Sequence, residues 1–161
     1  MEKRLDAKRR GSTLLSRALL FQEQSSVDLR TAKRFLNEGK YLDSVFQSVQ
    51  ASVNALSAVG YAHGQAQLPS ASPIRLLQFC MQFNPKFEEL HTACGFLEEA
   101  TQANPFDEIK PGVDNHATLA KDTFTTAQQV VGLAKRTLAR QLNTNPVRRF
   151  WQRVKPFGRG R

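Results

Sequence analysis

The sequence contains few of the residues that build metal, redox or covalent catalytic centres. Its 161 residues include only two cysteines, three histidines and one tryptophan. Two cysteines are too few for a disulfide framework, so Cys80 and Cys94 are predicted to be buried thiols in a reducing cytoplasm. The histidines are scattered and neither cysteine has a partner at ligand spacing, so no metal site is expected. No glycine-rich phosphate loop, GxSxG or HExxH motif occurs, and no cofactor is expected.

Long apolar runs are also absent. No segment approaches the ~18 uninterrupted apolar residues of a transmembrane helix, so no membrane insertion is expected. The apolar stretch LLSRALLF at 14–21 is short and interrupted by Ser16 and Arg17. No convincing small-residue cleavage site follows it, which argues against a signal peptide. These absences predict a cytoplasmic protein made of one domain with tails.

Two local clusters suggest chemistry, but each has a simpler interpretation. His91 precedes Cys94 by three residues, so both could share one helix face. One thiol and one imidazole are too few ligands for zinc, and no third group or oxyanion site accompanies them, so a core thiol beside a half-buried histidine is favoured. The adjacent carboxylates at 88–89 and 98–99 point about 100° apart on a helix, which favours a solvated face over acid–base catalysis. The sequence therefore predicts no catalytic residue.

Charge is plentiful and unevenly distributed. The net charge is +9, and residues 135–161 hold nine basic and no acidic side chains. Residues 1–10 hold five basic and two acidic side chains, whereas residues 11–134 hold nine basic and twelve acidic ones. Both ends are therefore basic and the body is slightly acidic. A block of like charge is often an interaction tail, and it binds a polyanion by releasing counterions.

The C-terminal stretch RRFWQRVKPFGRGR at 148–161 combines cations with aromatic rings. Its arginines and lysine can neutralise phosphates, while Phe150 and Trp151 can stack on bases or on a protein groove. This pattern favours nucleic-acid binding; docking on an acidic protein, contact with an anionic membrane surface and a tail without a specific role are the alternatives. The predicted nucleic-acid-binding residues are Lys3, Arg4, Lys8, Arg9, Arg10, Lys135, Arg136, Arg140, Arg148, Arg149, Trp151, Arg153, Lys155, Arg159 and Arg161.

Apolar residues recur at helical spacing, and strand patterns are nearly absent. The fold class predicted is all-α, a single antiparallel bundle of five to six helices. Gly39 predicts a left-handed helix end, and Ser72–Pro73 and Asn84–Pro85 predict two helix starts. The expected helices cover 5–22, 27–37 with a cap at Ser25 or Ser26, 41–60, 73–83, 86–102 and 116–142.

The helix expected at 41–60 has the clearest period, and its apolar residues are predicted to share one face: Leu42, Val45, Phe46, Val49, Val53, Leu56 and Val59. The organisation predicted for the chain has three parts. A basic N-terminal helix occupies 1–24, the helical bundle occupies 25–143, and a basic aromatic tail occupies 144–161.

One segment resembles a known family. TAKRFLNEGKYLDSVFQSVQASVNALSAVGYAHG at 31–64 resembles the opening helices of HEPN domains, helical bundles found in many bacterial and archaeal toxin and defence systems. The matching residues are Ala32, Phe35, Leu36, Gly39, Tyr41, Ala51, Ala55 and Ala58. Residues 89–109 look like the helix before the family's catalytic loop, and 117–138 look like its closing helix. The resemblance covers roughly 27–140, and a tetratricopeptide-like helix pair would produce part of the pattern at 31–59.

The resemblance also implies a catalytic motif that this chain lacks. Active HEPN proteins are metal-independent ribonucleases with an arginine followed four to six residues later by a histidine, usually at a dimer interface. The cation holds the scissile phosphate and the imidazole moves the proton. Here the loop reads NPFD at 104–107, and His116 comes twelve residues after Asn104. Val53 and Asn54 occupy the place of the acidic and basic pair on the long helix. The resemblance implies the fold and contact with RNA, and the missing residues predict no nuclease activity.

Together these features predict a non-catalytic nucleic-acid-binding subunit of a nucleoprotein complex, with RNA favoured over DNA. Expected partners are nucleic acid and either other protein subunits or further copies of the chain, and no small-molecule substrate is expected. The small helical subunits of CRISPR effector complexes in antiviral defence are similar in size, charge and helicity, which is an analogy only. The alternatives are a HEPN-like ribonuclease or toxin with an unrecognised site, and an adaptor whose basic tail docks on an acidic protein.

Overall fold

The computed structural model describes residues 2–102 and 115–144, and in these residues it contains helices and no strand. This confirms the predicted all-α class. The α-helices and the single 3₁₀ helix, η1, are α1 (Glu2–Asn37), α2 (Tyr41–Ala62), α3 (Pro73–Met81), η1 (Pro85–Leu90), α4 (His91–Gln102) and α5 (Asn115–Thr144).

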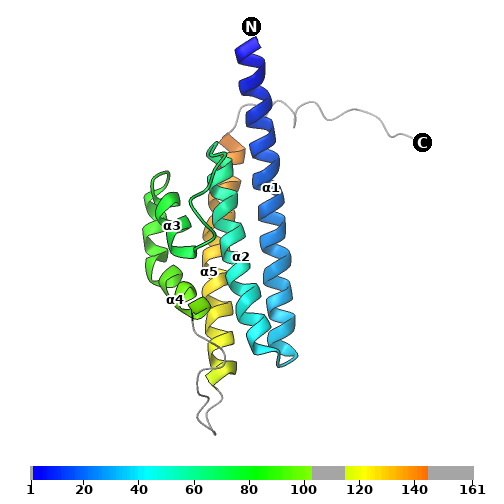
Figure 1. Ribbon diagram of the computed structural model, residues 1–161, viewed down its shortest axis with the longest axis vertical. Coiled ribbons are helices and arrows are strands. Elements are labelled where there is room, and N and C mark those ends of the chain that lie inside the picture. The colour runs from blue at the N-terminus through cyan, green and yellow to red at the C-terminus, as the bar shows by residue number, and fades with distance from the viewer. Residues whose placement is uncertain (1, 103–114, 145–161) are drawn as a thin grey trace, which may run out of the picture.

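Three long helices, α1, α2 and α5, lie side by side along the molecule (Figure 1). α1 and α2 are antiparallel, and α5 runs parallel to α2 and therefore antiparallel to α1. The short helices α3, η1 and α4 form a second layer against α2 and α5, on the side away from α1. Among the described helices α1 contacts only α2 and α5, and it packs mainly against α2. One flank of α1 is consequently left without a neighbouring helix from the described part of the chain.

The turn between α1 and α2 is a Schellman motif, as the glycine predicted. Gly39 has a φ of 73°, a left-handed conformation that a glycine adopts without steric cost. The backbone N–H of Lys40 donates to the carbonyl of Phe35 at 2.9 Å, and that of Gly39 donates to Leu36 at 3.3 Å. These two bonds satisfy carbonyls at the end of α1 that would otherwise lack partners.

The predicted helix break at Ser25 and Ser26 is wrong, because α1 continues without interruption from Glu2 to Asn37. A serine marks a helix start only when its hydroxyl accepts a bond from the backbone of the following turn. Here the Ser25 hydroxyl donates to the Ala51 carbonyl of α2 at 2.8 Å, and the Ser26 hydroxyl donates to the Gln22 carbonyl at 3.2 Å. Both hydroxyls are satisfied within a continuous helix, so position 24, predicted to end a separate N-terminal helix, lies inside α1.

Small side chains fill the contact between α1 and α2. Ala32, Ser44 and Ala51 are fully buried, and the Ser44 hydroxyl donates to the Ala32 carbonyl of α1 at 2.9 Å. The predicted single apolar face of α2 is only partly correct. Leu42 and Phe46 are exposed, the latter by 60%, because serines and alanines occupy the face toward α1 and the larger apolar residues face α3, α4 and α5.

The main core lies between α2, α5 and the short-helix layer. Its fully buried large side chains include Leu56, Leu77, Phe87, Leu97 and Val130. Ser72 begins α3 as predicted: its Oγ accepts from the Arg75 backbone N–H and donates to Glu98 of α4 at 2.7 Å. Asn84 caps the next segment, but this segment is η1 followed by α4 and not one α-helix over 86–102.

Both thiols belong to this core. Cys80 of α3 and Cys94 of α4 are fully buried, and the Cys80 thiol donates to the Leu56 carbonyl at 3.4 Å. Burial raises the pKa of each thiol from 9.0 to about 12; the nearby Cys94 adds to the effect on Cys80, and Glu98 adds to the effect on Cys94. Both thiols are therefore protonated at neutral pH.

Two buried serines of α2 are expected to respond oppositely to substitution by alanine. Ser44→Ala removes a hydrogen bond between helices and should lower the free energy of unfolding by about 1 kcal/mol. The Ser48 hydroxyl is equally buried and has no hydrogen-bond partner among the described residues, so Ser48→Ala should raise that free energy by about 1 kcal/mol. Urea unfolding of both variants measures the difference, and an equal loss in both would show that Ser48 has a partner.

The thiols predict a decline in stability at alkaline pH. Above pH 9 the unfolded chain loses protons from Cys80 and Cys94 that the folded chain keeps up to about pH 12. The free energy of unfolding should therefore fall as pH rises from 9 toward 12, by up to about 1.4 kcal/mol per thiol and pH unit. The double variant Cys80→Ala, Cys94→Ala lacks both thiols, so its change in stability with pH measures the contribution of the other titratable groups. The prediction is contradicted if the free energy of unfolding of this variant falls as steeply above pH 9 as that of the unmodified protein.

Candidate nucleic-acid interface

One end of the bundle carries the basic first turns of α1 and the basic last turns of α5. α1 starts at this end and α5 finishes there, because the two helices are antiparallel (Figure 1). Lys3, Arg4, Lys8, Arg9 and Arg10 belong to the first turns of α1, where only the path of the helix is described. The tail follows Thr144 in the sequence. Its predicted residues lie outside the described part of the chain: Arg148, Arg149, Phe150, Trp151, Arg153, Lys155, Arg159 and Arg161.

The last turns of α5 carry the predicted cations whose side chains are described. Lys135, Arg136 and Arg140 are all exposed, and none forms an ion pair with another described residue. Arg136 lies along the helix beside Gly132, with its Nη1 atom 3.4 Å from the place that a Cβ would take there. These three side chains continue the basic character of the tail onto the folded bundle.

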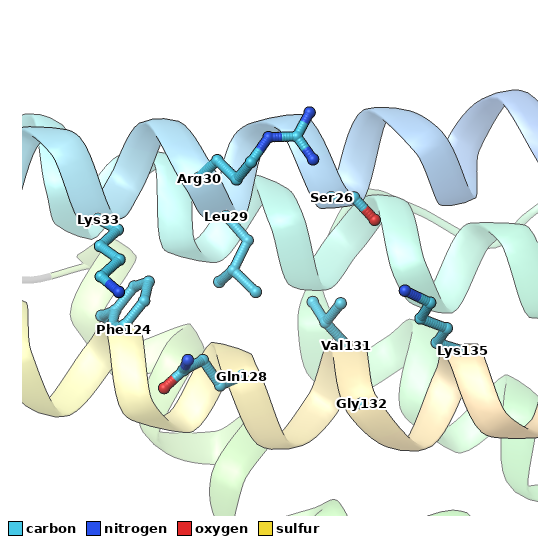
Figure 2. Close-up of a pocket in the computed structure, with 9 residues that line it drawn as sticks. All are labelled: Ser26, Leu29, Arg30, Lys33, Phe124, Gln128, Val131, Gly132 and Lys135. Atoms are coloured by element: carbon cyan, nitrogen blue, oxygen red, sulfur yellow. The ribbon is translucent and has the colours of Figure 1, made fainter.

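A groove of about 390 Å³ lies between α1 and α5 (Figure 2). The groove is present because α1 packs mainly against α2 and makes less contact with α5. Arg30 and Lys33 of α1 and Lys135 of α5 line this groove. Arg30 and Lys33 were not among the nucleic-acid-binding residues predicted from the sequence. The residues that line the groove are Ser26, Leu29, Arg30, Lys33, Phe124, Gln128, Val131, Gly132 and Lys135, and none of these nine is acidic.

The groove has an apolar floor and a cationic rim. Leu29 of α1 and Val131 of α5 point toward one another across it (Figure 2). Lys33 and the half-buried Phe124 lie at one end, and Ser26 and Lys135 lie at the other. The stem of Arg30 lines the groove while its guanidinium extends along α1 toward solvent. Such an arrangement can hold an anion that also carries an apolar surface.

The histidines are not brought together. His63 ends α2, with Nδ1 2.9 Å from the Val59 carbonyl and its ring stacked on Phe83 at 4.6 Å. His116 is in the first turn of α5, at the opposite end of the bundle. His91 is exposed at the start of α4, not half-buried as expected, while Cys94 points into the core. The pair therefore shares no site, and a thiol kept protonated by burial is a poor nucleophile.

No metal-binding group is evident within the described residues. There, no three or more His, Cys, Asp or Glu side chains are close enough to hold a metal ion. In the sequence, none of the three histidines has an arginine among the seven residues before it, so the ribonuclease spacing does not occur. The loop at 104–107, where the motif was sought, lies outside the described residues.

Asn54 of α2 bonds to a carboxylate of α1. Its amide donates to Asp28 Oδ2 at 2.7 Å, and Gln24 donates to Asp28 Oδ1 at 2.7 Å. Asp28 is only 8% exposed, and its described partners are neutral amides. The arrangement joins α1 to α2 and offers no cation for a phosphate. Sequence reasoning missed it, because Asp28 and Asn54 are 26 residues apart in the sequence.

Within the described residues, no helix combines the length and apolarity needed to cross a membrane.

Comparison with known proteins gives one match. A family model described as HEPN domain matches residues 18–141, from the middle of α1 through most of α5. No curated protein and no solved structure matches the chain. The matched range includes the α1–α2 hairpin, the short-helix layer and the groove, and it confirms the resemblance in the sequence. The family is consistent with an RNA-related role or a role in toxin and defence systems. The chain belongs to the HEPN domain family.

Proposed function

We propose that this protein is a non-catalytic HEPN subunit that binds nucleic acid, with RNA favoured, within a nucleoprotein complex. The observation that carries the proposal is the position of the basic first turns of α1 and the basic last turns of α5 at one end of the bundle (Figure 1). Sequence alone places these segments at opposite ends of the chain. The antiparallel arrangement of α1 and α5 brings the start of α1 and the end of α5 to the same end of the bundle, and Lys135, Arg136 and Arg140 are exposed on the last turns of α5.

The distribution of charge supports a polyanionic ligand. The body between the two basic segments, residues 11–134, holds more acidic than basic side chains. A field of this kind attracts a polyanion to one end of the molecule and orients it on approach. Each phosphate that a lysine or arginine neutralises releases counterions, so the affinity depends steeply on salt.

The arrangement of titratable groups supports a role without catalysis. Cleavage of RNA by this family needs a cation beside an imidazole, and no histidine of this chain follows an arginine at that spacing. His63 and His116 lie at opposite ends of the bundle, and the thiols are buried. A part in a larger complex is supported by the exposed apolar side chains of α1 and α2, which are Leu19, Leu20, Val27, Leu42 and Phe46.

Removal of residues 145–161 should abolish most of the affinity for single-stranded RNA while the helices remain. The tail carries six of the 23 lysines and arginines. The slope of log affinity against log salt should become shallower by about 0.7 for each phosphate that the truncated chain no longer neutralises. Fluorescence anisotropy at several salt concentrations measures binding, and circular dichroism measures helicity.

The matched control is a tail of scrambled order and unchanged composition, which should restore binding because phosphate contacts carry no sequence information. Affinity of the truncated chain equal to that of the whole chain would show that the tail does not bind RNA. A parallel titration with single-stranded DNA tests the preference for RNA.

Incubation of the full chain with RNA should leave the RNA intact on a denaturing gel. The double variant His91→Ala, His116→Ala controls for contaminating nucleases. Cleavage by the unmodified protein that disappears in this variant would assign catalysis to these histidines and overturn the non-catalytic proposal.

A further inference from the structure

We infer that the groove between α1 and α5 holds a strand of nucleic acid whose bases are unpaired. The inference rests on the proposed function and goes beyond it in two ways. It names a single strand as the ligand, and it assigns a binding site on the folded bundle that is separate from the C-terminal tail.

The charges along the groove have no partners in the described part of the chain. Arg30, Lys33 and Lys135 all line it, and none forms an ion pair or hydrogen bond with a described side chain. Two nearby cations behave differently, since Arg34 and Lys40 lie 3.8 and 2.7 Å from carboxylate oxygens of Glu38. The uncompensated charges of Lys33 and Lys135 at the two ends of the groove, with the Arg30 guanidinium beside it, create a local positive potential that favours an anionic ligand.

The apolar floor distinguishes an unpaired strand from a duplex. A duplex presents phosphates and keeps its bases stacked inside, so it gains nothing from Leu29, Val131 or the Phe124 ring. An unpaired base has a free apolar face that can stack on an aromatic ring or cover aliphatic side chains. The combination of cations on the rim and apolar groups on the floor therefore matches a strand with exposed bases.

The size and polar groups of the groove fit the same ligand. Its volume of about 390 Å³ is at the small end for ligand sites. From Phe124 to Lys135 it follows α5 for about 16 Å, at 1.5 Å per residue. This length suits a few nucleotides of one strand. The Ser26 hydroxyl and the Gln128 amide can bond to base edges or to sugar hydroxyls.

The groove leads toward the basic end of the molecule. Beyond Lys135, Arg136 and Arg140 follow along α5, both exposed, before the helix ends at Thr144. A strand that lies in the groove can therefore continue to the end at which α1 starts and α5 finishes (Figure 1). In this arrangement the tail supplies long-range attraction, and the groove selects unpaired bases.

The test compares ligands and matched variants of the full chain by fluorescence anisotropy. The ligands are a short single-stranded RNA, the same RNA annealed to its complement, and AMP as a competitor. The groove variant is Lys33→Gln with Lys135→Gln. The control variant is Arg75→Gln with Lys86→Gln, which removes two exposed cations from α3 and η1 in the layer that α1 does not touch.

The groove variant should bind the single strand about tenfold more weakly and lose the preference for single over double strands. The control variant has the same net charge as the groove variant. It should keep the affinity of the unmodified chain for the single strand and its preference for single over double strands. A third variant, Phe124→Leu, keeps all charges and an apolar floor but removes the ring. It should weaken single-strand binding about tenfold and leave duplex binding unchanged. Thermal unfolding checks that each variant is folded.

Several outcomes separate this inference from the proposed function. Full affinity in the groove variant together with loss of binding on removal of 145–161 would overturn the groove and leave the proposed function standing. Equal affinity of the unmodified chain for single and double strands would overturn the assignment of a single strand. Displacement of the strand by AMP at equal concentration would assign the groove to free nucleotides. Absence of RNA binding by the unmodified chain would overturn the proposed function itself.

Discussion

The packing of α1 against α2 through small side chains is the contact on which the rest of the structure depends. Two serine hydroxyls cross this contact and donate to backbone carbonyls of the opposite helix, which requires the helices to be close together. Because α1 is held tightly by α2, it has a looser contact with α5 and none with the short-helix layer among the described residues. The same packing therefore creates a stable hairpin, an open groove and an exposed outer flank.

The separation of charge gives this arrangement its functional meaning. The bundle carries the basic first turns of α1 and the basic last turns of α5 at one end, and a cationic groove runs along α1 and α5 toward that end. The chain belongs to the HEPN domain family, but none of its three histidines follows an arginine at the spacing of the ribonuclease motif. In our proposals the cations bind a phosphate backbone, and no imidazole is placed to complete a cleavage reaction. In these proposals the fold positions side chains that bind nucleic acid, and it positions none that cleave it.

Local signals predicted most helix ends correctly. Gly39, Ser72 and Asn84 act at turns or caps, where the backbone conformation depends on the residue and its immediate neighbours. The prediction failed at Ser25, whose hydroxyl bonds to a carbonyl 26 residues away in sequence. It also failed at Phe46, since apolar spacing on α2 shows that residues share a face but does not show which faces are covered. The groove was missed for the same reason, because its cations come from two helices far apart in sequence.

The sequence by itself determined the all-α class, the turns at its glycine and proline signals, the basic segments at both ends of the chain and the lack of a ribonuclease motif. Each of these follows from residue types and short-range spacing. Tertiary structure alone decided that α1 is one helix, that the start of α1 and the end of α5 lie at one end of the bundle, and that Arg30 and Lys33 join Lys135 along a groove. These features depend on which helix faces pack together. Small side chains of α1 and α2 that are far apart in the sequence determine which faces make contact.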